Sequence, residues 1–247
     1  MKNYFKKFLS AKHLYHFCES NWRNFAILSL LILLFTTFWI FAKVPADFQQ
    51  GEVAKIMYIH VPSAILSLAL FLTLGLLGCL YIIFRIKVTT AVMRAITPIG
   101  LMLTILVLVT GSIWGKPTWG TWWIWDARLT SELILAFLYL VLFTYDRAMQ
   151  ELESTPFVIA TLAIIGSLDL PIIHYSVSWW HTLHQGPSIL AFQKPTISWP
   201  MLWPLYLMII AISLMTAAII MLRCLGIIRA QAKDTQWMLA KGISDVQ

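Results

Sequence analysis

The chain has 247 residues, of which 60% are hydrophobic and only 12% are charged. Soluble domains carry about 25% charged residues, so this composition, with a mean hydropathy of +0.78, excludes an ordinary soluble protein and indicates a membrane protein. The net charge of +7 does not indicate nucleic-acid binding, because the basic residues lie in short segments between apolar stretches. Three widely spaced cysteines form no CxxC pair or Cys/His cluster, which excludes a dithiol redox motif.

Six apolar stretches are long enough to cross a bilayer core of about 30 Å, which takes roughly 20 helical residues. Four of them carry no charged side chain. The fourth stretch contains Glu132, and the fifth contains Asp169 and Pro171 near its end. The sequence therefore predicts an all-α, polytopic membrane protein. Its six predicted spans cover residues 25–42, 61–84, 95–115, 129–145, 156–175 and 197–222.

The basic residues set the orientation of these spans. Six spans put both termini on one side, and 13 of the 18 lysines and arginines then lie in segments on that side. The positive-inside rule makes it the cytoplasmic side. The basic N-terminal segment is followed by a long apolar stretch with no small-residue cleavage site, which predicts an uncleaved anchor. We expect a single membrane domain over residues 1–247, with residues 223–247 as a cytoplasmic tail.

Tryptophan gathers on the predicted outer side, which holds ten of the 12 tryptophans. An aromatic belt would occupy both membrane interfaces, so a belt accounts for Trp39, Trp199 and Trp203 but not for the others. Five indoles fall within twelve residues, from Trp114 to Trp125. We call residues 113–130 the outer platform.

The spacing within the outer platform predicts its shape. Trp119, Trp122, Trp123 and Asp126 stand at i, i+3, i+4 and i+7, which favours a short helix or loop lying in the interface plane. Such an array of indoles presents a broad, rigid, apolar surface that suits a large flat ligand with polar edges.

Charged residues adjoin the outer platform. We expect Asp126 and Arg128 to pair with each other where the segment ends; the alternative is that Arg128 meets a ligand carboxylate. Lys55 and Lys116 are further cations on the outer side.

Four of the six histidines lie at predicted outer ends: His60, His174, His181 and His184. A lone histidine there is usually a polar tip, but two outer segments that bring histidines beside a tryptophan platform favour heme, whose iron takes an imidazole above and below the ring. The residues alone do not choose between His181 and His184.

Other cofactor chemistries fit less well. A zinc site is disfavoured because the outer segments supply few carboxylates and no cysteine. A transmembrane electron carrier would need paired histidines deep in the bilayer, and no histidine lies in the middle of a predicted span. Asp169 is an intramembrane acid, for which a functional role and the support of a kinked helix are equally open.

The outer residues also carry a family resemblance. Members of a superfamily of heme-handling membrane proteins share a WGxxWxWD signature. The positions that we match to it are Trp114, Gly115, Trp119, Trp122, Trp125 and Asp126. With six spans, the chain length, and His60 and His184 flanking the signature, the whole chain resembles the heme exporter protein C family of bacterial cytochrome c maturation.

This resemblance implies that heme b is bound as cargo on the periplasmic face, with His60 and His184 as its axial ligands. It implies that Arg128 and Lys55 are candidate contacts to heme propionates or to a partner, although Lys55 stands where we expect an arginine. The implied heme platform comprises Trp114, Gly115, Trp119, Trp122, Trp123, Trp125 and Asp126.

The resemblance further implies delivery of heme to a periplasmic heme chaperone, within a complex of ABC-type ATPase and membrane subunits and a small membrane adaptor. The chain would not be an enzyme. It has no GxxxxGK[ST] phosphate loop, so ATP hydrolysis would come from a partner. The main alternative is a transporter that moves heme across the bilayer, which the apolar middle sections of the spans disfavour. A scaffold without heme contact is a third hypothesis.

Overall fold

The computed structural model describes residues 10–149, 152, 154–180, 182–184, 197–232 and 237. The described residues contain helices and no strand, and six helical segments are long and apolar enough to cross a membrane. These two findings confirm the predicted all-α fold with six spans. The helices are α2 (Ala11–Lys43), the 3-10 helix η1 (Glu52–Ile56), α3 (Met57–Phe84), α4 (Val88–Trp119), α5 (Ala127–Met149), α6 (Thr155–Gly166), α7 (Asp169–Trp179) and α8 (Trp199–Ala232).

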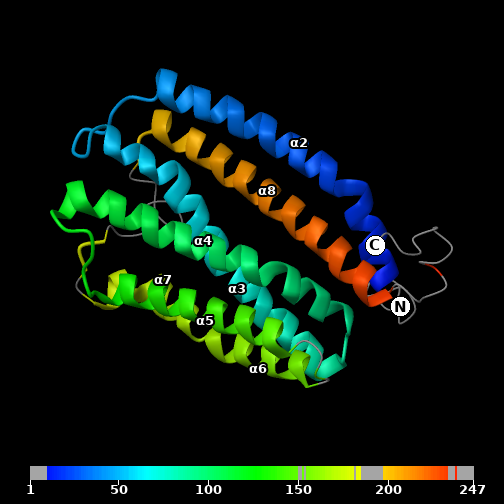
Figure 1. Ribbon diagram of the computed structural model, residues 1–247. Coiled ribbons are helices and arrows are strands. Elements are labelled where there is room, and N and C mark those ends of the chain that lie inside the picture. Colours follow the sequence, from blue (N-terminus) through cyan, green and yellow to red (C-terminus); the bar gives the residue numbers. More distant parts are fainter. Residues whose placement is uncertain are drawn as a thin grey trace.

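The helices form an elongated bundle (Figure 1). α2 runs beside α8 along most of its length, while α3 packs against both α4 and α6, and α5 packs against α4 and α7 (Figure 1). The start of α2 and the end of α8 lie at one end of the bundle. The opposite end, which we call the loop end, collects residues 44–56, residues 120–126 and the described residues after α7.

Most helices extend beyond the predicted spans. α4, for example, begins at Val88 and continues to Trp119, whereas the apolar stretch alone predicted 95–115. Apolar composition marks only the part of a helix that lies in hydrocarbon, whereas backbone hydrogen bonding continues the helix until a residue ends it.

The fifth span is not one continuous helix. It divides into α6 and α7 at the turn formed by Ser167 and Leu168. Pro171 explains the break, because proline has no N–H to donate to the carbonyl four residues earlier and its ring crowds that carbonyl. The alternative that Asp169 and Pro171 accompany a kinked helix therefore agrees with the structure, in which Asp169 lies in the first turn of α7.

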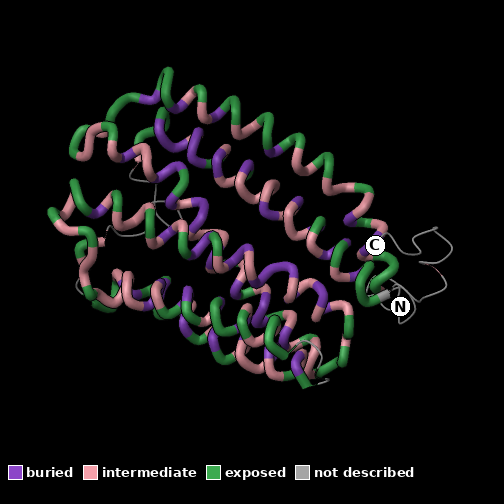
Figure 2. The backbone as a smooth tube through the Cα atoms, in the orientation of Figure 1, coloured by how far each residue is buried: buried purple, intermediate pink, exposed green. Residues whose placement is uncertain are grey.

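Burial divides the bundle into an interior and an apolar exterior (Figure 2). Large hydrophobic side chains such as Phe38, Phe41 and Ile83 are well exposed on the outside, as expected where a protein faces lipid rather than water. Polar side chains are instead buried between helices, where Ser63, Ser67 and others are fully enclosed.

One interior contact joins three helices near the middle of the bundle. Tyr139 on α5 donates its hydroxyl hydrogen to the carbonyl oxygen of Ser67 on α3 at 2.7 Å. Its ring meets Phe71 edge to face at a centroid distance of 4.8 Å. On α4, Gly100 leaves the space that the Tyr139 ring fills, since a Cβ there would overlap the ring.

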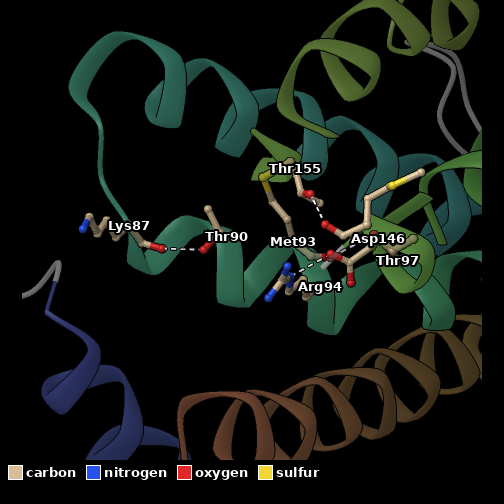
Figure 3. Close-up of polar contacts among 8 residues, drawn as sticks. Lys87, Thr90, Met93, Arg94, Thr97, Asp146 and Thr155 are labelled. Atoms are coloured by element: carbon tan, nitrogen blue, oxygen red, sulfur yellow. Dashed lines mark hydrogen bonds and ion pairs between the residues drawn. The ribbon is translucent and has the colours of Figure 1, made fainter. Parts of the chain in front are cut away.

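An ion pair closes the end of the bundle opposite the loop end (Figure 3). Arg94 on α4 donates from Nε to Oδ1 of Asp146 on α5 at 2.7 Å, and both side chains are 19% exposed. In the same view Thr155 at the start of α6 donates to the carbonyl of Met149 at the end of α5 (Figure 3). These contacts hold α5 to its neighbours at the end remote from the outer platform.

The contact between Gly100 and Tyr139 predicts that two glycine-to-alanine variants differ clearly in their free energy of unfolding. Gly100→Ala should destabilise the purified protein by about 1–3 kcal/mol, because the new methyl group must displace a fully buried ring. Thermal unfolding in detergent measures the effect. Gly226→Ala on α8 is the matched control: apart from the backbone of its own helix, no described atom lies within 4 Å of its Cβ position, so this change should be neutral or stabilising by under about 1 kcal/mol. Equal unfolding temperatures for the two variants would contradict the packing described.

Candidate functional site

A pocket lies at the loop end of the bundle. It contains about 730 Å³ of space not filled by atoms, part of which is open to solvent. The sequence-predicted residues that line it are His60, Trp114, Gly115, Trp119, Trp123, Arg128 and His184. Residues from the second, third and fourth spans and from the segment after α7 therefore meet at one place.

His60 enters the pocket from the first turns of α3. Its side chain is 9% exposed, and its Nδ1 lies 3.0 Å from Oγ1 of Thr110 on α4. The indole of Trp114 meets the imidazole edge to face, with 5.6 Å between ring centroids. Gly111 gives the imidazole room, because a Cβ at that position would lie 3.1 Å from His60 Cε1.

His184 lines the pocket from the segment after α7. It is half-buried, and its ring lies 6.2 Å from the ring of Trp119 between centroids. Its backbone N–H donates to Oγ1 of Thr182 at 3.0 Å. His181, the alternative ligand left open by the residues alone, lies outside the described residues.

Within the outer platform, residues 113–119 belong to α4, residues 120–126 form a loop and residues 127–130 begin α5. Of the short helix or loop that the spacing favoured, the structure has the loop. α4 continues through Pro117 to Trp119 and ends at Gly120, whose φ of 80° is left-handed. The N–H of Gly120 donates to the carbonyl of Lys116 at 3.0 Å, and Lys116 Nζ donates to the carbonyl of Gly120 at 3.0 Å. A glycine in this conformation terminates a helix, so residues 120–126 are not helical.

The loop conformation separates the indoles. Trp114, Trp119 and Trp123 face the pocket, whereas Trp122 and Trp125 do not line it and are 57% and 75% exposed. A single helical face would have carried Trp119, Trp122 and Trp123 together. The platform is therefore two sets of indoles, one around the pocket and one on the exposed surface.

Matched letter by letter, the WGxxWxWD pattern falls on residues 119–126. Its glycine is therefore Gly120, and Trp114-Gly115 precedes the pattern. Each of these two positions requires glycine for a different reason. Gly120 has the left-handed φ that ends α4, whereas a Cβ at Gly115 would lie 3.0 Å from Trp119 Cε3. Gly115 thus allows the Trp119 ring to lie against α4.

Asp126 joins the loop to two other segments. Its Oδ1 accepts the backbone N–H of Leu129 at 2.8 Å, which is the bond that an N-cap residue makes at the start of a helix. Its Oδ2 accepts the hydroxyl hydrogen of Thr182, and Thr182 in turn accepts the N–H of His184. Asp126 therefore caps α5 and holds the segment that carries His184.

The predicted pairing of Asp126 with Arg128 is wrong. No ion pair joins these two described residues. Arg128 instead donates from Nη1 to the carbonyl oxygen of Ile173 on α7 at 3.0 Å. The pairing fails because Asp126 is used as the α5 cap, so its oxygens point to a backbone N–H and to Thr182. Arg128, which lines the pocket, keeps further N–H groups for a ligand.

Lys55 lies in η1 and does not line the pocket. Its Nζ forms an ion pair with Oε2 of Glu52 at 2.8 Å and lies 5.9 Å from the ring of Phe41. His174 is exposed on α7, packs against Tyr175, and is likewise absent from the pocket lining. Asp169 is buried, and its Oδ2 has no hydrogen-bond partner among the described residues.

Three polar groups of the pocket were not predicted. Glu132 on α5 lines it, is 5% exposed, and accepts a hydrogen bond from Ser67 Oγ at 3.4 Å. Gln50 accepts the indole N–H of Trp114 at 2.8 Å. The indole N–H of Trp123 is buried with no partner among the described residues. Glu132 had a usable signal, because an acid inside an apolar span is a functional candidate by default.

Comparisons with known proteins identify the family of the chain. The sequence model of the family described as Heme exporter protein C matches residues 4–239. The chain is 46% identical over 195 residues to the heme exporter protein C of Haemophilus influenzae, covering 79% of each chain. It is 38% identical over 214 residues to that of Escherichia coli, covering 86% of each. It is 40% identical over 185 residues to that of Bradyrhizobium diazoefficiens, covering 75% of this chain and 70% of the relative. The chain belongs to the heme exporter protein C family.

Proposed function

We propose that the chain holds heme b as cargo in the pocket at the loop end and delivers it for cytochrome c maturation. The observation that carries the proposal is that His60 and His184 line the same pocket although they come from segments far apart in the chain. Imidazole is a common axial ligand of heme iron. His60 and His184 are therefore the proposed ligands above and below the ring.

The walls of the pocket fit such a cargo. Trp114, Trp119 and Trp123 supply planar apolar surface, which favours stacked or edge-to-face contact with a large aromatic ring. Arg128 supplies a cation whose planar group suits a carboxylate, as a heme propionate would require. The buried indole N–H of Trp123 supplies one more hydrogen-bond donor without a partner in the described residues.

The position of the pocket favours delivery over transport across the bilayer. His60 lies in the first turns of α3, Trp114 and Trp119 at the end of α4, and Arg128 at the start of α5, so the lining belongs to one end of the bundle. By the charge distribution of the sequence, this end faces the periplasm. We expect heme to pass from here to a periplasmic heme chaperone. We place the chain in the bacterial inner membrane, in a complex with ABC-type subunits that hydrolyse ATP and a small membrane adaptor.

The exposed indoles suggest where the chaperone would dock. Trp122 and Trp125 are exposed beside the pocket without lining it. Tryptophan is enriched at the centre of protein–protein interfaces. We assign these two indoles to the partner surface and the pocket-lining indoles to the cargo.

The first test removes the proposed ligands. Detergent-purified protein should show the spectrum of six-coordinate heme with two imidazole ligands, and the double variant His60→Ala, His184→Ala should lose nearly all bound heme because no axial ligand remains. The heme-to-protein ratio and the visible spectrum measure the effect. His174→Ala is the matched control, since His174 is exposed and lies outside the pocket. Full heme occupancy in the double variant would refute the ligand assignment.

The second test separates the two sets of indoles. Trp123→Leu should release heme to an excess of an acceptor apoprotein roughly tenfold faster, because an aromatic contact contributes about 0.5–1.5 kcal/mol beyond its buried area. Trp125→Leu should retain heme normally but slow its transfer to the chaperone. Equal effects of the two changes on heme release would contradict the division.

The third test concerns the bond between Asp126 and Thr182. Thr182→Val should lower heme retention by about tenfold, within the range of about 10–100-fold seen when a partner of a metal ligand is removed. Because the change loosens only the His184 segment, free imidazole should restore the six-coordinate spectrum. Thr182→Ser keeps the hydroxyl and should behave as the parent protein. An unchanged retention in Thr182→Val would show that the bond does not position His184.

A further inference from the structure

The imidazole of His60 is held by a side chain that neither the sequence nor the pocket lining identified. Thr110 lies on α4, one helix away from His60 on α3, and its Oγ1 is 3.0 Å from His60 Nδ1. A contact between two hydrogen-bonding groups of this kind can run in either direction, because an imidazole nitrogen donates or accepts according to its tautomer. The direction decides which ring nitrogen remains available.

The other contacts of Thr110 fix that direction. Its Oγ1 also lies 2.6 Å from the carbonyl oxygen of Leu106 and 3.3 Å from that of Val107. Carbonyl oxygens only accept, so the single hydroxyl hydrogen of Thr110 goes to the nearer of them, at Leu106. The oxygen of Thr110 can then only accept from His60. Nδ1 of His60 therefore carries the ring hydrogen, and Nε2 keeps its lone pair.

We infer that Thr110 is a positioning residue of the site, which holds His60 in the tautomer whose Nε2 can ligate iron. The inference rests on the proposed function, since it assigns His60 as an iron ligand. Metal-ligating histidines commonly donate their second ring N–H to a fixed acceptor, which sets the tautomer and ring orientation and raises the basicity of the ligand. Here the acceptor is itself oriented by a carbonyl of its own helix.

The His60 ring also has a hydrogen bond to the backbone carbonyl of Val107, which lies on the same face of α4 as Thr110. The side chain is 9% exposed. Gly111, the neighbour of Thr110, presents its backbone to the imidazole, and Trp114 one turn further along α4 covers it edge to face. One face of α4 thus supplies both the hydrogen-bond acceptor and the walls. Nε2 of His60 therefore has its lone pair available before any ligand binds.

The test replaces the Thr110 hydroxyl by a methyl group of similar size. In Thr110→Val the Nδ1–H of His60 loses its hydroxyl acceptor and the ring keeps only the backbone contact at Val107, so the imidazole is held less firmly and becomes a weaker donor to iron. Heme retention in detergent should fall by about 10–100-fold. The reduction potential of the heme that remains should become more positive, because a less basic ligand stabilises ferric iron less. Thr110→Ser restores the hydroxyl and should recover both properties.

A matched control lies on the same helix. Thr104 is fully buried, and its hydroxyl donates to the carbonyl of Gly100 at 2.8 Å, but it has no described contact with His60. Thr104→Val removes the same group from the same helix and should change neither heme retention nor potential. The unfolding temperatures of both valine variants show whether either change acts through the stability of the fold.

The outcomes distinguish the inference from the proposed function. If Thr110→Val keeps the parent retention and potential while His60→Ala loses heme, His60 remains a ligand and the inference is overturned. If the double alanine variant of His60 and His184 keeps its heme, the proposed function fails and the inference fails with it. Loss in Thr110→Val, recovery in Thr110→Ser and no change in Thr104→Val support the inference.

Discussion

The close packing of α3 against α4 is the contact on which the rest of the site depends. His60 is supplied by α3, whereas α4 supplies the acceptor for its ring nitrogen and the surfaces that confine it. Gly111 makes the approach possible, because a side chain there would meet the imidazole. The two helices are consecutive in the chain and joined by a short turn after Phe84. A ligand site is thus built on a helix pair that also forms part of the core.

The interior of the bundle makes this arrangement rigid. Water is absent from a bilayer core, so a buried hydroxyl gains most by bonding within the protein. Such bonds run between helices, among them those from Tyr139 to the carbonyl of Ser67, from Tyr58 to that of Met201, and from Ser29 to that of Ala211. They tie α3 to α5, α3 to α8, and α2 to α8. Side chains at the loop end therefore project from a framework that is fixed by directional bonds as well as by packing.

The sequence predicted most of the fold, because a bilayer requires every span to be an apolar helix of about 20 residues. Length and hydropathy were sufficient to find six helical segments, and Pro171 marked the place where the fifth is interrupted. The helix ends were harder, since α4 passes through Pro117 and stops only at Gly120. Helical spacing from Trp119 to Asp126 predicted one apolar face, but a left-handed glycine inside that interval removes the periodicity on which the prediction relied.

The site was predicted in outline and missed in its contacts. Clustering of tryptophan and the outer histidines identified His60, Trp119 and Trp123 as neighbours, because those residue types are rare and conspicuous. The choice of His184 over His181 came from the family resemblance. Thr110 could not be found in this way: it is one of many hydroxyls in apolar helices, and only the spatial register of α3 against α4 brings it to His60. The partner of Asp126 was mistaken for a similar reason. Nearness in sequence suggested Arg128, whereas the fold supplied Thr182.

The two oxygens of Asp126 have separate partners, one at the start of α5 and one in the segment before His184. The two bonds are separate, so loss of the Thr182 bond would leave the start of α5 capped. The bond to the Leu129 N–H keeps the carboxylate in place at the start of α5. Releasing Thr182 from Asp126 would cost one hydrogen bond rather than a turn of helix. A bound molecule would then leave without any change in the helices. For a pocket that binds and releases heme, as we propose, the cap of α5 and the contact to the His184 segment are therefore separate bonds.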